Sequence, residues 1–361
     1  MTQDSNQICC DAVAAPPLTE TGPGREPPRI AGRVGFEISR RERWEHFRCR
    51  LGSFRDRYSV TPGLYACGNP GPQGDVLVSA SYKLSFDTLR KELEGLDCWI
   101  LVLDTRGINV WCAAGKGTFG TAELVRRIGA TRLGEVVFHR RLLLPQLAAP
   151  GVNAAEVRRQ TEFKISFGPV RAADIPAYMK AGYRKTPAMS TVSFGLRDRL
   201  VLTPMELNPA LKKFPWFAAM ALLLFGLQRQ GIMFTDIWNG GGMAFLILGL
   251  TAVASGAFLT PVLLPFLPFR SFAVKGWIAG LAVVFLTSLI PIVSEAMNSR
   301  LLLSAAYLLF PVISSYLALQ FTGSTTFTGM SGVRKELKIT LPVYAAAAAV
   351  SLLLLIMFKL T

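Results

Sequence analysis

The run from Asn109 to Thr121, NVWCAAGKGTFGT, holds the residues of this sequence whose types and spacing could do chemistry. Asn109 is a helix-capping residue, and a short helix over residues 110–114, ended by Gly115, would carry Cys112. A cysteine thiolate is a soft metal ligand, although an isolated cysteine is more often a buried structural thiol. Because the glycines that follow would let the backbone approach a large ligand, we interpret Cys112 as a thiol presented to one.

The same run contains a second pattern, Gly-Lys-Gly-Thr-Phe-Gly at 115–120, which has the G-x-G-x-x-G spacing of a dinucleotide-binding loop. In that motif the glycines follow a strand directly, and an acidic residue closes the next strand. Here ten residues separate the glycines from the strand that ends at Asp104, and Glu135 would open the next strand. The context therefore disfavours dinucleotide binding, and no Gly-Lys-Ser/Thr is present for a P-loop.

The elements that would position this run alternate between strand-like and helix-like segments from about residue 75 onward. Short apolar runs predict buried strands, and helical spacing or capping residues predict helices. Strands are expected at 76–79, 98–104, 135–138 and 163–167, and helices at 86–96, 121–127, after the capping box of Asn153 and Glu156, and at 174–180. The alternation predicts a Rossmann-like α/β domain with a mostly parallel sheet. Ligands bind beyond the carboxyl ends of such strands, so the loops after 98–104 and 135–138 are the candidate ligand loops.

Charge and hydropathy divide the chain into a charged front and an apolar back. Residues 1–213 hold 31 of the 39 Lys and Arg and 21 of the 24 Asp and Glu, a net charge of +10, and residues 214–361 carry the other +5. No Lys/Arg run or aromatic RNA motif is present, which argues against a nucleic-acid partner. We expect a mobile N-terminal tail and lead-in over 1–55, an α/β domain over 56–210 and a transmembrane anchor over 211–361.

The apolar back is expected to form an all-α domain of five transmembrane helices. Apolar segments of suitable length lie at about 214–228, 241–268, 273–293, 301–321 and 341–358. Basic residues are more frequent in the loops on one side (Lys212, Lys213, Arg270, Lys275, Arg334, Lys335, Lys338) than on the other (Arg229, Arg300, Lys359). This bias predicts a multi-pass protein of the inner (cytoplasmic) membrane whose N-terminal domain faces the cytoplasm. Ionisable residues lie only at span ends, which favours an anchor over a transporter.

The run NVWCAAGKGTFGT resembles the cap-helix motif of the mercury-methylating corrinoid proteins, membrane-anchored relatives of the large subunit of the corrinoid iron–sulfur protein of the acetyl-CoA pathway. Other stretches are similar to the same group: TPGLYACGNPGPQGDVLVSASYKLSFDTLR (61–90), LLPQLAAPGV (143–152), FGPVRAADIPAY (167–178) and FTGSTTFTGMSGVRKEL (321–337). Together they span most of residues 60–190 and one loop between expected spans. The five expected spans agree with the membrane-anchored branch.

This resemblance implies a cobalamin-type corrinoid whose cobalt takes the Cys112 thiolate as its lower axial ligand, so that Cys112 is both the catalytic residue and the metal ligand. The corrinoid contacts that it implies come from the two ligand loops: Asn109, Trp111, Cys112, Ala113, Ala114, Gly115, Lys116, Gly117 and Thr118 from the first, and Gln146, Leu147, Pro150, Gly151 and Val152 from the second. The histidine-ligand motif of other corrinoid domains, Asp-x-His-x-x-Gly, is absent, and the histidines are His46 and His139.

The implied activity is that of a corrinoid-dependent methyltransferase, which transfers a methyl group from cobalt to inorganic Hg(II) to give methylmercury. Hg(II) is an electrophile and needs the methyl group with its electrons, a departure that a strongly donating thiolate should favour, with radical transfer as an alternative. Regenerating Co(I) for a folate-type methyl donor needs low-potential electrons. The chain has no cysteine cluster for an iron–sulfur centre, so a small ferredoxin-like partner is implied. Membrane lipid is a further expected partner of the basic residues.

Two other functions stay open. The chain could carry a methyl group to another acceptor, as in the acetyl-CoA pathway, or it could be a non-catalytic membrane protein that binds a corrinoid. The expected spans and Cys112 argue against the first of these, and nothing in the sequence excludes the second.

Overall fold

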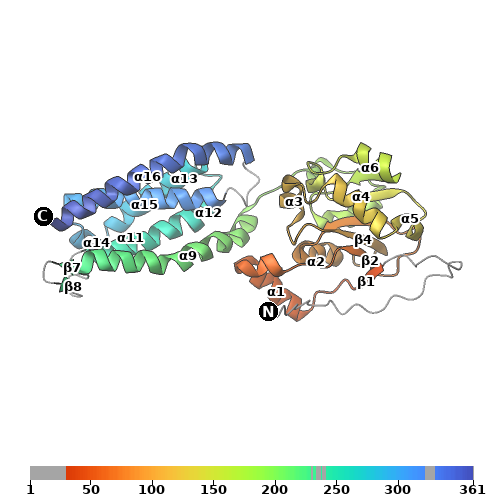
Figure 1. Cartoon of the computed structure of the whole chain (residues 1–361), viewed down its shortest axis with the longest axis horizontal. Helices are drawn as coiled ribbons and strands as arrows, with labels where there is room; N and C mark the ends of the chain where they lie inside the picture. Colours follow the sequence, from red (N-terminus) through yellow and green to blue (C-terminus); the bar gives the residue numbers. More distant parts are fainter. Residues whose placement is uncertain (1–29, 229–230, 233–236, 238–240, 322–329, 361) are drawn as a thin grey trace, which may run out of the picture. The chain divides into compact units, whose positions relative to one another are not determined.

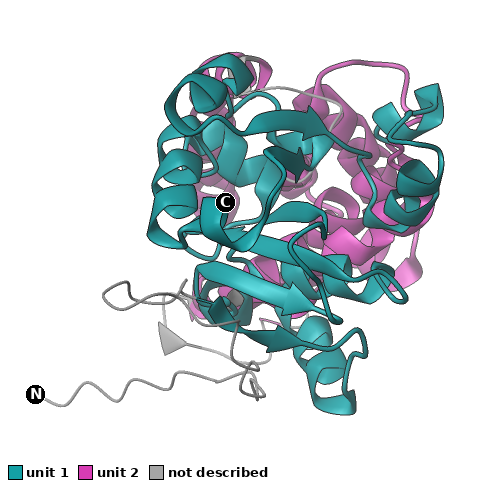
Figure 2. Cartoon of the chain, turned by 90° about the vertical axis from the view of Figure 1, so that its right-hand side faces the viewer, with its two compact units in different colours: residues 1–49, 53–192 teal, residues 50–52, 193–361 magenta. Residues whose placement is uncertain are grey.

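The computed structural model describes residues 30–228, 231–232, 237, 241–321 and 330–360. The chain divides into two compact units, one formed by residues 1–49 and 53–192 and the other by residues 50–52 and 193–361 (Figure 2). The first is an α/β unit and the second is largely helical (Figure 1). The predicted order of an α/β part followed by a helical part is therefore confirmed. The expected boundary between residues 210 and 211 lies inside helix α9 (Leu196–Gly226).

The α/β unit is built on a six-stranded sheet in the order β1-β2-β4-β3-β5-β6. The strands are β1 (Ile30–Val34), β2 (Gly63–Cys67), β3 (Val76–Ala80), β4 (Cys98–Leu103), β5 (Arg141–Leu144) and β6 (Lys164–Phe167). Strands β4, β3, β5 and β6 are parallel, and the pair β1 and β2 runs antiparallel to them. The expectation of a mostly parallel sheet is thus correct for four strands, but the sheet is mixed.

Helices cover both faces of this sheet, so its central strands are buried throughout. In β4, Trp99, Leu101 and Leu103 pack with the core under α4 (Thr121–Ala130) and α6 (Ala154–Thr161). The alternate residues Cys98, Ile100 and Val102 pack with α2 (Lys83–Glu92) and α7 (Ile175–Lys180). This alternation follows from the period of two in a strand, and it explains why β4 reads as a continuous apolar run.

The prediction of a strand at 135–138 was wrong. Residues Leu133–Val136 form a short helix, α5, and the strand lies at Arg141–Leu144. Leu133 and Val136 sit one helical turn apart and both enter the core, so a turn of helix buries the apolar residues here as well as a strand would. The Leu142–Leu144 run supplies the buried strand, and the second ligand loop therefore begins at Pro145.

Part of the expected lead-in is ordered. Residues 1–29 lie outside the described residues, but β1 pairs with β2, helix α1 spans Arg40–Leu51, and the 3-10 helix η1 spans Ser53–Arg57. Further short elements are the 3-10 helix η3 (Ala172–Asp174) and helix α8 (Pro187–Ser190). The α/β unit therefore begins at the latest at residue 30, ahead of the expected residue 56.

The helical unit agrees with the five expected apolar segments in place, but the helix ends differ. Its elements are α9, α11 (Gly242–Ala254), the π-helical turn η4 (Ser255–Leu259), α12 (Thr260–Leu263), α13 (Phe272–Ser288), α14 (Pro291–Ala296), α15 (Arg300–Gln320) and α16 (Met330–Leu360). Strands β7 (Leu227–Gln228) and β8 (Gly231–Ile232) form a small hairpin, so the unit is not all-α. Among the described residues, the helices over Gly242–Leu263, Arg300–Gln320 and Gly332–Leu360 are long and apolar enough to cross a membrane, and α13 is shorter. Three of the five expected spans therefore meet this criterion, and the expected first span, in α9, does not.

Candidate functional site

Helix α3 (Val110–Lys116) follows β4 and carries Cys112. The side chain of Asn109 accepts a hydrogen bond from the Cys112 backbone N–H at 2.9 Å, which caps the first turn. The helix ends at Gly117, which has φ of 80° and donates its N–H to the carbonyl of Ala114. The predicted Asn109 cap is confirmed, but Gly115 lies inside the helix. Gly117 takes the left-handed conformation that ends it.

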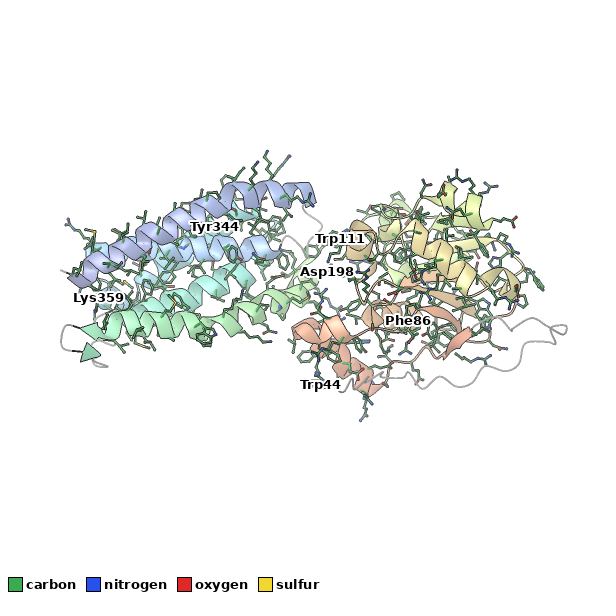
Figure 3. All side chains as sticks on the ribbon, viewed as in Figure 1. Trp44, Phe86, Trp111, Asp198, Tyr344 and Lys359 are labelled. Atoms are coloured by element: carbon green, nitrogen blue, oxygen red, sulfur yellow. The ribbon has the colours of Figure 1, made fainter. Side chains whose placement is uncertain are left out.

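One face of α3 is anchored in the core, and the opposite face is accessible. Ala113 and Ala114 are buried beside the sheet, and Ile108 and Val110 pack against the same core. On the outward side Trp111 and Cys112 are half-buried, and the following residues 115–117 are exposed. Trp111 lies at the margin of the α/β unit, whereas Phe86 lies in its interior (Figure 3). The helix thus holds the Cys112 thiol at the surface of a rigid scaffold.

Cys112 differs from the other described cysteines in its exposure. Cys49, Cys67 and Cys98 are buried, whereas Cys112 is half-buried. Cys67 and Cys98 face each other across β2 and β4, and their hydrogen bond, together with burial, raises the pKa of the Cys98 thiol. Cys9 and Cys10 lie outside the described residues. Within the described part of the chain, Cys112 is therefore the cysteine that a ligand can reach.

The second ligand loop packs directly against α3. After β5, the 3-10 helix η2 (Gln146–Ala148) leads to Gly151, whose backbone lies on α3. A Cβ at Gly151 would lie 2.3 Å from the Phe119 carbonyl oxygen and 3.0 Å from Ala114 Cα. Only glycine permits this approach. The two loops that the sequence predicts to form the site are therefore neighbours at the carboxyl edge of the parallel strands, as expected.

The remaining predicted contact residues divide between buried and exposed positions around this junction. Val152 is buried, Gln146 and Leu147 are half-buried, and Pro150 is exposed. Gln146 accepts a hydrogen bond from Lys185, and the Thr118 hydroxyl donates to the Ala113 carbonyl at 3.4 Å. Lys116 is exposed at the end of α3. The exposed members could contact a ligand, and the buried members support the loop.

The start of the first ligand loop is held by two buried hydroxyl residues that the sequence analysis missed. Ser81 Oγ, just after β3, accepts hydrogen bonds from the backbone N–H groups of Thr105 and Gly107, both at 3.1 Å. The Thr105 hydroxyl in turn donates to the Ile108 carbonyl at 2.6 Å. These bonds fix the backbone between β4 and α3. The available signal was a hydroxyl residue within two residues of the end of each of two adjacent buried strands.

The surface of α3 around Gly115 and Gly117 is exposed. Apart from its chain neighbours and the helix's own backbone, no heavy atom lies within 4 Å of the position that a Cβ would take at Gly115 or Gly117, so the outward surface there is open. A thiolate is a suitable donor for such an ion. His139 precedes β5 and pairs with the Gly74 carbonyl at 2.8 Å, which places it at the opposite edge of the sheet. Among the described residues, no cluster of three or more His, Cys, Asp or Glu could hold a metal ion.

Comparisons with known proteins match most of the α/β unit. Residues 53–179 match the family model of the CO dehydrogenase/acetyl-CoA synthase delta subunit. The chain is 31% identical over 131 residues to the acetyl-CoA decarbonylase/synthase complex subunit gamma of Archaeoglobus fulgidus, covering 36% of this chain and 27% of that protein. It is 32% identical over 129 residues to the same subunit of Methanopyrus kandleri, covering 35% and 27%.

These matches cover only part of this chain and part of each relative. The chain spans about a quarter of the length of these curated relatives, 27% in each case. The family match includes α3 and the loop at 145–152 and ends within α7, before the helical unit. None of the matched names mentions mercury. The α/β unit, including both ligand loops, is thus the part of the chain that resembles subunits of acetyl-CoA decarbonylase/synthase complexes.

Proposed function

We propose that the α/β unit binds a corrinoid at the junction of α3 with the loop at 145–152 and takes part in methyl transfer. The observation that carries this proposal is the half-buried Cys112, which an N-capped helix presents at the carboxyl edge of the parallel strands. The open surface at Gly115 and Gly117 leaves room for a ligand to approach α3. The family match over residues 53–179 supports the same assignment, because it covers both loops.

In this proposal each part of the site has its own role. A bound corrinoid would supply a cobalt ion that carries a methyl group and releases it to an acceptor. The Cys112 thiolate would be the lower axial ligand, and the Asn109 cap fixes the turn from which the thiol projects. Gly151 holds the second loop against α3, and exposed Lys116 is placed to meet a polar group of the ligand.

For the acceptor we propose inorganic Hg(II). A soft thiolate donates charge to its metal ion, which favours departure of the methyl group with its electron pair. A methyl group that leaves with its electron pair can bind to an electrophile such as Hg(II). Transfer of the methyl group as a radical is the alternative. The cap-helix run NVWCAAGK and its half-buried cysteine support this acceptor. A folate-type methyl donor or its methyltransferase and a small ferredoxin-like electron donor would complete the cycle.

A second acceptor has an observation of its own in its favour. The matched relatives are named as subunits of acetyl-CoA decarbonylase/synthase complexes, and these names favour a methyl carrier for acetyl-CoA synthesis over a mercury methyltransferase. Deleting the gene separates the two acceptors. Loss of methylmercury formation with acetyl-CoA synthesis intact would support Hg(II), and the reverse result would support the carrier.

We further propose that the helical unit anchors the chain in the inner membrane, with the α/β unit on the cytoplasmic side. Three helices long and apolar enough to cross a membrane support this, as does the excess of basic residues in the loops on one side. Resistance of the chain to extraction from membranes by alkaline carbonate tests the attachment. A chain released by that wash would contradict it.

The direct test of the catalytic assignment compares Cys112→Ala with the wild type and with Cys98→Ala, which removes a buried thiol instead. Membranes that hold each variant receive methylated corrinoid and mercuric chloride, and methylmercury is measured by mass spectrometry. Because loss of groups that only support a metal ligand costs 10- to 100-fold, loss of the ligand itself should lower the rate by about 100-fold or more. An undiminished rate in Cys112→Ala would refute the role of Cys112. Bound corrinoid without transfer in the wild type would favour a non-catalytic binding protein.

A further inference from the structure

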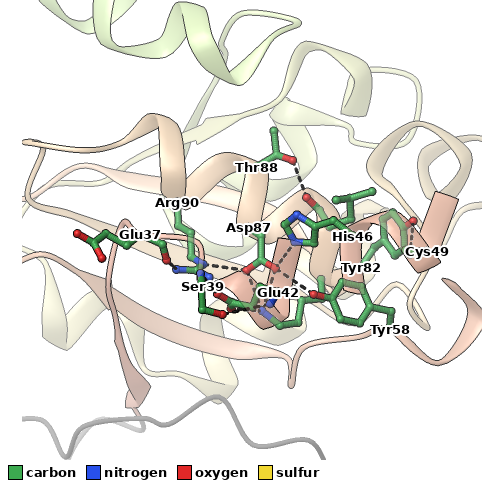
Figure 4. A network of polar contacts seen from close by, with 12 residues as sticks. Glu37, Ser39, Glu42, His46, Cys49, Tyr58, Tyr82, Asp87, Thr88 and Arg90 are labelled. Atoms are coloured by element: carbon green, nitrogen blue, oxygen red, sulfur yellow. Dashed lines mark hydrogen bonds and ion pairs between the residues drawn. The ribbon is translucent and has the colours of Figure 1, made fainter. Parts of the chain in front are cut away.

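Helix α1 is fixed to helix α2 along one face by a buried polar network (Figure 4). Glu42 on α1 accepts hydrogen bonds from Lys83 Nζ at 3.0 Å and from Arg90 Nη2 at 2.6 Å. One turn further along, His46 Nε2 lies 2.8 Å from Asp87 Oδ2. Asp87 is fully buried and pairs with Lys83 at 2.9 Å and with Arg90 at 2.8 Å. The network therefore sets the rotation of α1 on the α/β unit.

The opposite face of α1 exposes two aromatic rings and two arginines. Arg40, Arg43, Trp44 and Phe47 follow the spacing i, i+3, i+4, i+7, so they share one side of the helix. Trp44 is 60% exposed and Phe47 is 49% exposed, and their rings stack with centroids 5.4 Å apart. Among the described residues, no side-chain hydrogen bond or ion pair engages Arg40 or Arg43. We call these four residues the aromatic–arginine face.

Two further arginines flank this face. Arg41 is exposed beside its partner Glu45, and the guanidinium of Arg48 lies over the Phe54 ring at 4.4 Å. An exposed, stacked Trp–Phe pair rimmed by arginines is uncommon on a purely solvated surface, because aromatic side chains bury large apolar areas when they can. Aromatic rings sit at the headgroup level of membranes, and basic residues beside them are attracted to anionic lipid.

We propose that the aromatic–arginine face of α1 docks on the anionic headgroup surface of a membrane. Trp44 and Phe47 would enter the headgroup region, and the arginines would pair with lipid phosphates. The side chains of this face protrude from α1. A membrane interface is fluid, so it can accommodate them without a preformed pocket. An acidic protein would satisfy the arginines but would need a matching pocket for both rings. The inference rests on the proposed membrane attachment, for which the same chain offers three sufficiently long apolar helices.

The test places a photoreactive group at this face in the full chain. Phe47 is replaced by p-benzoylphenylalanine, and the protein is reconstituted in nanodiscs of phosphatidylcholine with or without phosphatidylglycerol. Phe138 of the same α/β unit is 73% exposed, so the same replacement there provides a matched control. We expect lipid crosslinks, identified by mass, at position 47 in the anionic discs. The yield should exceed by at least tenfold both the yield at position 138 and the yield at position 47 in phosphatidylcholine alone.

Charge reversal provides the second arm. Because one arginine near an anionic surface contributes roughly fivefold to binding, the double variant Arg40→Glu/Arg43→Glu should lower the crosslink yield by at least about tenfold. Neither arginine takes part in the hydrogen bonds and ion pairs of the buried network, so the melting temperature should not change. Equal yields in the two kinds of disc, equal yields at positions 47 and 138, or crosslinks to an acidic protein in native membranes in place of lipid would each overturn the inference. Failure of the chain to enter the discs would contradict the membrane attachment as well.

Discussion

Helices α1 and α3 both lie on the surface of the α/β unit, but their polar groups are arranged in opposite ways. The inner face of α1 is held by charged residues that pair with one another, with Asp87 fully buried at their centre. Helix α3 is held by apolar contacts, one asparagine cap and close glycine packing, and it leaves a thiol half-buried. The paired charges of α1 therefore act as a scaffold, whereas uncharged contacts support the accessible thiol of α3.

The largest loss of stability is expected when the buried network that holds α1 is disrupted. Asp87→Asn leaves Lys83 and Arg90 without their central carboxylate in a buried site. Breaking a buried ion pair in this way costs about 3–5 kcal/mol of unfolding free energy, measured by denaturant titration. Arg126→Ala, which breaks an ion pair of an arginine whose side chain is 58% exposed, serves as the control and should cost less than about 1 kcal/mol. Similar losses in the two variants would contradict a scaffolding role for the network.

A smaller effect is expected where the second loop meets α3. Gly151→Ala places a Cβ against the Phe119 carbonyl and Ala114, so the loop must shift, at a cost of about 1–3 kcal/mol. Gly115→Ala is the matched variant, because nothing lies within 4 Å there and alanine favours a helix interior. Thermal unfolding should show a loss for the first variant and no loss for the second. If Gly115→Ala nevertheless weakens corrinoid binding, the ligand approaches over that position.

Low pH should weaken the buried network around Asp87. Burial pushes the pKa of Asp87 upward, but hydrogen bonds from His46, Lys83 and Arg90 outweigh this and hold the pKa at about 2. Because the folded-state pKa lies below the unfolded value near 3.9, this stabilisation is complete above about pH 5 and is lost progressively as the pH falls through about 2. The contribution is about 2 kcal/mol, and it should vanish from the acid-unfolding profile of Asp87→Asn. An unchanged profile in that variant would assign the acid sensitivity to other groups.

The smallest loss of stability is expected when the cap of α3 is removed. Asn109→Ala removes the cap on the Cys112 backbone N–H and should lower the unfolding free energy by about 1 kcal/mol. Asn109→Asp retains an oxygen acceptor at that position and should preserve the stability. If the two variants behave alike, the side-chain oxygen does not cap the helix.

The elements that the sequence predicted best are those whose signals are local. The apolar run of β4 and the Asn109 and Asn153 caps are seen in the structure because burial on both faces and a capping side chain leave direct traces in the residue pattern. The helix end at Gly117 instead of Gly115 could not be chosen locally, since both glycines permit it. The strand expected at 135–138 failed because a short apolar run fits a turn of helix equally well.

Helix α1 was not predicted from the sequence, for a different reason. Its inner face is occupied by Glu42, Glu45, His46 and Cys49, which contact charged or hydroxyl groups from distant parts of the sequence. Hydrophobic periodicity cannot detect a helix that is buried through ion pairs, because no apolar stripe marks the buried face. The Ser81 and Thr105 contacts that position α3 are likewise tertiary, and only the structure brings them together.

We propose that the Cys112 thiolate is the axial ligand of a bound corrinoid, and the spectrum of that corrinoid tests this role. Visible and EPR spectra of the purified full chain with bound corrinoid are compared between the wild type and Cys112→Thr, which keeps a side chain of similar size without sulfur. We predict that the substitution changes the spectrum, because the metal ion loses a strongly donating sulfur ligand. A bound corrinoid whose spectrum is unchanged by the substitution would contradict the claim.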